Sequence, residues 1–227
     1  MALFAALSYA VTQSGRGGGN IDRETVSLNA SDLVQYASLM RSTIDRMRLI
    51  NGCSDIEISF ERDPFDGSDP LYVNPNAPSN FSCHVFHPNG GRVVLRNPIN
   101  LQGSITSSTI VSDSISFTAN NRIVGVGTTD STTNSNDLVL LYPFLTQNAC
   151  EEINRGLGIS DDIIDNNVTF PTIAGGASFR GSYATVSADI GNELSGADLV
   201  GQIAACVNEM GTSSSDGLHF YHVLIER

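Results

Sequence analysis

Apolar side chains recur through residues 20–50 at alternating spacings of four and three residues. This spacing places them on one face of an α-helix, and it is also the spacing of a coiled-coil seam. Asn51-Gly52 follows directly, and glycine there favours the left-handed conformation that ends a helix. The pattern predicts one amphipathic helix whose stripe either covers the core of its own domain or forms a seam between copies. The stripe consists of Val26, Ala30, Leu33, Ala37, Met40, Ile44 and Met47.

Residues 1–11 ahead of this helix are almost wholly apolar, and residues 15–19 form a glycine-rich run. Glycine is a poor helix former, so we expect a break between the two segments. A stretch of about ten apolar residues is shorter than the roughly 20 that span a bilayer. The combination predicts an N-terminal anchor that inserts into a membrane or into a bundle of like segments. The predicted assembly residues are Leu3, Phe4, Leu7, Val11, Val26, Leu33, Ala37, Met40, Ile44 and Met47.

The rest of the chain has the pattern of short strands. Ile56, Ile58 and Phe60 alternate with polar residues, which is typical of a half-buried strand. Residues 63–80 contain several prolines and are expected to be an irregular connection, and Asn120-Asn121 is expected to be a turn. Short strands linked by turns favour antiparallel pairing. The further predicted strands are residues 81–86, 92–95, 114–118, 122–126, 138–144 and 219–225.

Two shorter helices are predicted beyond the first. Thr146 is a suitable N-cap for a helix that ends at Gly156 or Gly158. A second helix is expected over residues 195–205, directly before Cys206.

These elements predict an α+β fold. A long N-terminal helix, made of the hydrophobic segment, the glycine break and the amphipathic part, precedes a mainly antiparallel β-sheet head with one or two short helices. The predicted domains are residues 1–50, the anchor and assembly helix, and residues 51–227, the β-rich head.

The four cysteines are too far apart in the sequence to form a short metal-binding motif. An even number of well-separated cysteines predicts two disulfides and an oxidising compartment. Four cysteines allow three connectivities. We favour Cys53 with Cys83 and Cys150 with Cys206, because each pair would link a helix to a following extended segment.

The chain is strongly acidic, with a formal net charge of −12, and all 12 of its basic residues are arginine. Nucleic acid and anionic lipid both need clusters of positive charge, so nucleic acid is not an expected partner. The absence of lysine also excludes a Schiff-base lysine and a phosphate-binding P-loop.

No motif for catalysis or cofactor binding stands out in the sequence. The two His-x-x-His pairs, at residues 84–87 and 219–222, would place their rings on opposite faces of a strand, where they could not share a metal ion. Asp63, Asp66 and Asp69 resemble a loose calcium loop, but the spacing and the terminal glutamate of an EF-hand are missing. We therefore expect no enzyme activity, no cofactor and no metal site.

The N-terminal plan resembles that of type IV pilins and pseudopilins, in which a hydrophobic helix continues as an amphipathic helix and precedes a sheet with disulfides. Residues 2–17 (Ala-Leu-Phe-Ala-Ala-Leu-Ser-Tyr-Ala-Val-Thr-Gln-Ser-Gly-Arg-Gly) and 220–227 (Phe-Tyr-His-Val-Leu-Ile-Glu-Arg) are also similar to segments of uncharacterised bacterial proteins with an N-terminal membrane helix. Pilins usually carry a glutamate near the start of the hydrophobic helix, where this chain has Ala5.

The resemblance implies a non-catalytic structural subunit of an extracellular filament or envelope assembly. Its expected partners are further copies of itself or related pilin-like subunits, with membrane contact through the N-terminal segment before assembly. The expected location is the cell surface, an extracellular filament or the periplasm. Two alternatives stay open: a membrane-tethered extracytoplasmic module that binds glycan or protein, and an extracytoplasmic hydrolase.

Overall fold

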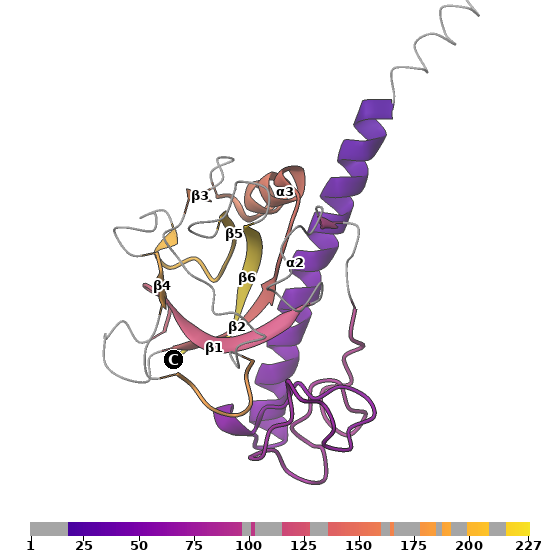
Figure 1. The fold of residues 1–227 in the computed structure, drawn as a ribbon, viewed down its shortest axis with the longest axis vertical. Coiled ribbons are helices and arrows are strands. Elements are labelled where there is room, and N and C mark those ends of the chain that lie inside the picture. The colour runs from indigo at the N-terminus through magenta and orange to yellow at the C-terminus, as the bar shows by residue number, and fades with distance from the viewer. Residues whose placement is uncertain are drawn as a thin grey trace, which may run out of the picture.

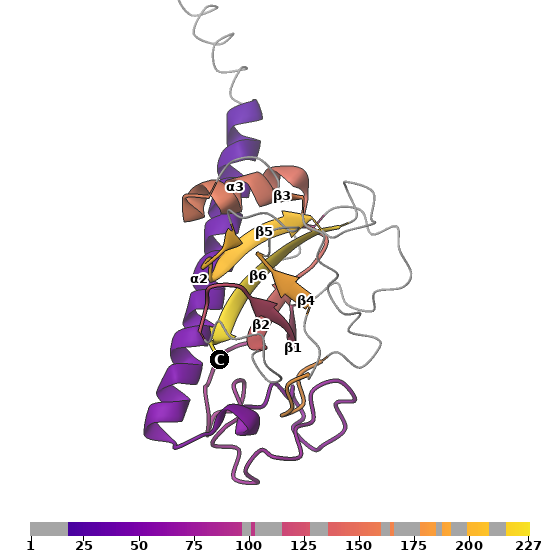
Figure 2. The same cartoon turned by 90° about the vertical axis from the view of Figure 1, so that its left-hand side faces the viewer.

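The computed structural model describes nine stretches of the chain, namely residues 18–96, 101–102, 115–127, 136–159, 164–165, 178–184, 188–191, 199–208 and 217–227. A long helix runs along one side of a sheet, and a shorter helix crosses near its upper part (Figures 1 and 2). The elements are α2 (Gly18–Ile50), the 3-10 turn η2 (Asp55–Glu57), β1 (Ser116–Ile123), β2 (Asp137–Tyr142), α3 (Gln147–Leu157), β3 (Ile164–Asp165), β4 (Ala188–Ile190), β5 (Ala204–Asn208) and β6 (Leu218–Ile225).

The predicted amphipathic helix is confirmed as α2, and it begins two residues earlier than expected. Gly18 and Gly19 belong to its first turn, so the predicted glycine break is wrong at these two positions. The other glycines of that run and residues 1–11 lie outside the described residues. The end of the helix is as expected: the amide of Asn51 donates to the carbonyl of Met47, and Gly52 has a φ of 70°.

The sheet has six strands in the order β3-β5-β6-β2-β1-β4. The four inner strands pair antiparallel, but β4 pairs parallel to β1 and β3 pairs parallel to β5. The predicted antiparallel head is therefore wrong, because the sheet is mixed at both edges. Each edge strand comes from a segment far along the chain from its neighbour, so the preference of turn-linked strands for antiparallel pairing does not apply to it.

The predictions for one pair of strands, the turn between them and one helix need correction. The two strands expected at residues 114–118 and 122–126 overlap the single strand β1, in which the expected turn is an irregularity of register between Thr118 and Asn121, and residues 124–126 lie beyond its end. Asn121 is fully buried, which a surface turn would not allow. The helix expected over residues 195–205 is wrong at its C-terminal end, since Ala204 and Ala205 belong to β5, while residues 195–198 lie outside the described residues. Short apolar runs such as residues 203–207 suit a buried strand as well as a helix.

Residues 53–96 contain none of the strands that their alternating pattern predicts. η2 occupies the start of the first expected strand, and a capping box between Ser54 and Glu57 holds this turn. The predicted segments meet only at a bridge between Ser59 and His84 and at one backbone hydrogen bond from Val93 to Val85. Turns on both sides interrupt the bridge, and Arg92 has a positive φ of 62° that no strand residue adopts.

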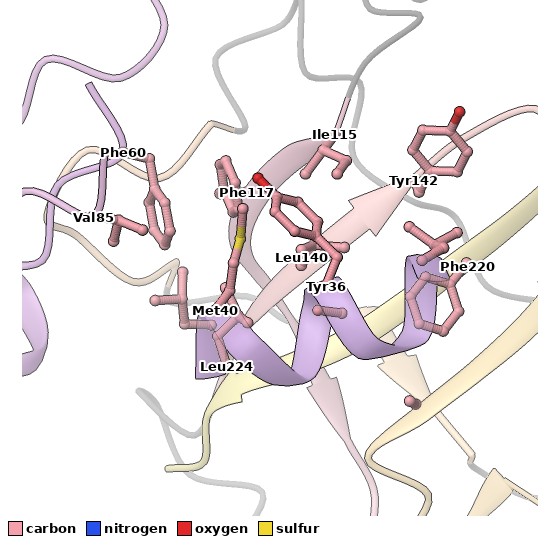
Figure 3. Close-up of a cluster of buried hydrophobic side chains, with 14 of the residues drawn as sticks. Tyr36, Met40, Phe60, Val85, Ile115, Phe117, Leu140, Tyr142, Phe220 and Leu224 are labelled. Atoms are coloured by element: carbon pink, nitrogen blue, oxygen red, sulfur yellow. The ribbon is translucent and has the colours of Figure 1, made fainter. Parts of the chain in front are cut away.

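The stripe of α2 is buried against the sheet of its own chain. Met40 and Ile44 are fully buried, and in Figure 3 Tyr36 and Met40 lie over Leu140 of β2 and Leu224 of β6. Burial of a large aliphatic side chain contributes about 1.5 to 3 kcal/mol, so the stripe is a major part of the head's stability. Of the two interpretations of the stripe, the structure therefore shows a helix that covers its own core.

The opposite face of the sheet is also buried. Val139 and Leu141 of β2, with Tyr221 and Val223 of β6, belong to a second apolar cluster. Strands buried on both faces carry nearly continuous apolar runs, which explains why β2 and β6 were predicted correctly from their composition.

α3 is fixed to β5 by two kinds of bond. Cys150 and Cys206 form a disulfide, and Cys53 and Cys83 form the other, so the predicted connectivity is confirmed. The buried side chain of Asn154 then donates to the carbonyl of Cys206 (2.9 Å) and accepts from its amide (2.8 Å). Asn154 of α3 thus satisfies both the amide and the carbonyl of Cys206, the residue of β5 to which the disulfide links α3.

We predict that Asn154→Ala lowers the free energy of unfolding by about 2 to 4 kcal/mol, because two buried backbone groups lose their partners. Urea denaturation measures this change. Asn148→Ala is the matched control, since Asn148 lies on the exposed face of the same helix and should cost under about 0.5 kcal/mol. Equal destabilisation by the two substitutions would contradict the role given to Asn154.

His222 lies between the sheet and α2 with a neutral ring. Its Nδ1 is 2.9 Å from the carbonyl of Val223, and its Nε2 is 3.5 Å from the hydroxyl of Ser38 on α2. Burial lowers the pKa of His222 to about 4; the hydrogen bond with Val223 opposes this shift and the charge of Arg41 adds to it. Protonation of this ring therefore places an uncompensated charge under the helix.

We predict that His222 destabilises the fold in acid. Its pKa is lower in the folded than in the unfolded chain, so its contribution is present above about pH 6.5 and is lost as the pH falls towards 4. Between pH 7.5 and pH 5 the wild type should lose about 2 kcal/mol relative to His222→Gln. The comparison with a variant is needed because burial raises the pKa of Asp137 to about 6, which gives the opposite pH dependence. A constant difference between wild type and variant would contradict a buried neutral His222.

Candidate functional site

An apolar groove of about 930 Å³ opens beside the C-terminal half of α2, in the irregular loop formed by residues 53–96. This loop lies beside the lower end of α2 in both views (Figures 1 and 2). Its two halves face each other across the groove, one from residues 62–70 and one from residues 86–95. The apolar lining is Phe65, Pro70, Phe86, Val93, Val94 and Leu95.

The end of α2 and the sheet together hold this loop in place. The Cys53–Cys83 disulfide closes its first 30 residues directly after the helix. The ring of Phe60 stacks on the ring of Phe117 in β1, with 3.8 Å between the ring centroids. The loop is thus anchored to both layers of the fold although it contains no strand.

A buried carboxylate organises the lower half of the loop. Glu61 accepts the amide of Gly67 at 2.7 Å with one oxygen, and its other oxygen is 3.2 Å from Nε2 of His84. Burial lowers the pKa of His84, and the contact with Glu61 opposes that shift. This contact joins the two halves of the loop below the groove, so we assign the pair a structural role.

Residues 91–96 form the upper wall of the groove and run along α2. The hydroxyl of Tyr36 donates to the carbonyl of Val94 (2.9 Å), and Arg46 donates to the carbonyl of Gly91 (3.0 Å). A β-carbon at Gly91 would lie 2.9 Å from the Thr43 side chain and 2.4 Å from a backbone oxygen, so only glycine permits this close approach to the helix.

The wall turns apolar side chains toward solvent. Val93 is buried, whereas Val94 is 72% exposed and Leu95 is 39% exposed. The backbone amides of Val94 and Leu95 make no hydrogen bond within the described part of the chain. The groove therefore offers both apolar surface and unused backbone donors, which is the combination that extended peptides bind.

The rim of the groove carries charges that are already paired. Arg62 donates to both oxygens of Asp69, at 2.9 and 3.3 Å. Burial would raise the pKa of Asp69, but the hydrogen bonds from Arg62 and from the amide of Leu71 outweigh it and keep this pKa low. The side chain of Arg92 donates to the carbonyl of Pro88. The site can bind an apolar, uncharged segment, and it presents no nucleophile paired with a base.

The structure places the predicted site residues in different parts of the fold. The four cysteines form the two disulfides, which are those of a protein that folds in an oxidising, extracytoplasmic compartment.

Val26 is partly buried at the edge of the core, and the other stripe residues are buried within it. They are not free to contact a second copy. The buried ones are Leu33, Ala37, Met40, Ile44 and Met47, while Leu3, Phe4, Leu7 and Val11 lie outside the described residues.

The three aspartates that resemble a calcium loop do not converge on an ion site. Asp69 is occupied by Arg62, and Asp66 accepts the amide of Ser68 at 2.9 Å. No cluster of three or more metal-ligating side chains occurs in the stretches that the structure describes. None of the helices found there combines the length and apolarity that crossing a membrane requires.

The groove was missed in the sequence because its two halves are 16 or more residues apart. The residues that line its upper wall, Val93-Val94-Leu95, were visible as an apolar run and were predicted to be a strand. Only the exposed position of Val94 in the folded chain distinguishes a surface segment from a core strand.

Comparison with known proteins adds no assignment to this site. No protein-family profile, no curated protein and no solved structure matches the chain.

We predict that Tyr36→Phe loosens the upper wall without unfolding the head. Loss of the hydroxyl removes the bond to Val94 and a 3.2 Å bond from the amide of Arg96. The two lost hydrogen bonds are together worth about 1 to 2 kcal/mol, so tryptic cleavage after Arg92 and Arg96 should become about 5- to 30-fold faster. Tyr72→Phe is the control, because Tyr72 accepts the amide of Phe117 away from the wall. Similar acceleration in both variants would show that the effect is global.

Proposed function

We propose that this protein is a non-catalytic, pilin-like structural subunit of an extracytoplasmic assembly, and that its N-terminal region mediates assembly. The observation that carries the proposal is the position of α2. Residues 30–47 of the helix pack into the head, while its first turns project past α3 and the sheet (Figures 1 and 2). The apolar segment that precedes Gly18 is thereby attached at the far end of a rigid rod.

The charge and the bonds of the projecting part support this proposal. Arg23 forms an ion pair with Glu152 of α3 at 3.1 Å, which ties the base of the projection to the head. Leu28 is 67% exposed on the outward side of α2, between Val26 and Ala30, which pack on the head. A subunit that packs against other copies can bury this leucine in the contact.

The groove favours a second candidate function. An extracytoplasmic module that binds another protein would use an apolar groove with unused backbone amides in the same way. The two functions differ in what the purified protein does by itself, because a structural subunit associates with its own copies.

We predict that the full-length protein forms filaments or helical bundles, with the α2 axes aligned along the assembly, when viewed by electron microscopy. Leu28→Asp should raise the concentration needed for assembly at least tenfold, because a charge would replace an exposed apolar side chain on the outward side of α2. Leu49→Asp is the matched control at the opposite end of α2, where the side chain is 85% exposed. A monodisperse monomer at every concentration would overturn the proposed function.

A further inference from the structure

The groove and the apolar terminal segment lie toward opposite ends of α2. Figures 1 and 2 show the loop that contains the groove around the C-terminal end of the helix, while the N-terminal end projects on the other side. Two different complementary surfaces at opposite ends of one subunit make a heterologous contact, which generates an open chain of subunits when it does not close into a ring.

The sequence of the terminal segment suits an extended binding mode. Positions 3, 5, 7, 9 and 11 are Leu, Ala, Leu, Tyr and Val, while positions 2, 6, 8 and 10 are Ala or Ser. In an extended chain, alternate residues share a face, so the large side chains would gather on one side, with Phe4 as the only large residue on the other. That face matches the apolar lining of the groove, and the backbone of the segment can accept a hydrogen bond from one of the two unused amides, that of Val94 or that of Leu95.

Electrostatics favour this occupant over an acidic or basic partner. Residues 1–15 contain no charged side chain. Arg62 and Asp69 pair with each other, and the other two charged lining residues, Asp63 and Arg92, have opposite signs, so the groove carries no net formal charge to attract a charged peptide. Because each copy carries a formal net charge of −12, an uncharged segment is the part of a second copy that can approach with the least repulsion.

Chain length favours the groove of a neighbour over the groove of the same copy. From Gly18 to Tyr36, which contacts the wall, α2 rises about 27 Å. The seven residues from 11 to 17 extend at most about 24 Å even when fully stretched. A return of Val11 to the wall in its own copy would need residues 11–17 to be almost fully stretched along α2, so chain length favours the groove of a neighbour.

We propose that residues 3–11 of one copy bind in extended conformation in the groove of the next copy, against Phe65, Phe86, Val94 and Leu95. This inference rests on the proposed function and names the surface that receives the terminal segment. Each copy donates its segment at one end and accepts a segment at the other, so assembly is head to tail and open-ended.

Two full-length variants test the proposal by complementation. Leu7→Asp places a charge in the donated segment and leaves the groove intact, and Val94→Asp does the reverse at an exposed position that folding tolerates. Light scattering after size-exclusion chromatography should show each variant alone as a monomer. A 1:1 mixture should form a heterodimer that grows no further, because it has one functional segment in one functional groove. Val200→Asp, 48% exposed and outside the groove, should assemble as the wild type does.

The outcomes separate this inference from the proposed function. Assembly of Val94→Asp at the wild-type concentration would overturn the groove as the receiving surface and leave the structural role standing. Two monomeric variants that form no heterodimer would also overturn the inference. A wild-type protein that stays monomeric would overturn the proposed function itself.

Discussion

The fold depends on the burial of one face of α2 against the central strands of the sheet. β6 is buried along its whole length between β5 and β2, and the stripe of α2 covers one of its faces. Because the helix precedes every strand in the sequence, these contacts join the start of the chain to its last residues. A surface ion pair also joins α2 to the end of the chain, because Arg41 of α2 pairs with Glu226 just beyond β6.

This constraint also decides which surfaces remain for contacts with other molecules. A stripe that is buried in its own core cannot serve as a seam between copies. The large apolar side chains that stay exposed include Leu28 on the outward side of α2 and Val94 on the groove wall. The disulfide between Cys53 and Cys83 makes the second surface possible, because it closes an irregular loop that contains too little regular hydrogen bonding to hold itself. In the chain-entropy account, a closed loop of about 30 residues contributes roughly 3 to 4 kcal/mol.

The parts of the fold that sequence reasoning found are those with a local signal. The stripe of α2, the Thr146 cap and Gly158 end of α3, and the apolar run of β6 each lie within one continuous segment. The disulfide pairing also followed from local reasoning about which cysteines flank a helix. The mixed edges of the sheet could not be predicted, because β3 and β4 have two and three residues and are defined only by partners far along the chain. The groove could not be predicted for the same reason. Tertiary contacts turn Val94 outward in a segment whose sequence pattern resembles a strand.

The central claim is that residues 30–47 of α2 are part of the head's core rather than a separable assembly helix. Hydrogen exchange of the full-length protein, followed by mass spectrometry, tests it most directly. Amides of residues 30–47 should exchange as slowly as those of β6, because both open only when the whole head unfolds, while amides of residues 20–27 should exchange faster. Rapid exchange along the entire helix, with β6 still protected, would contradict the account.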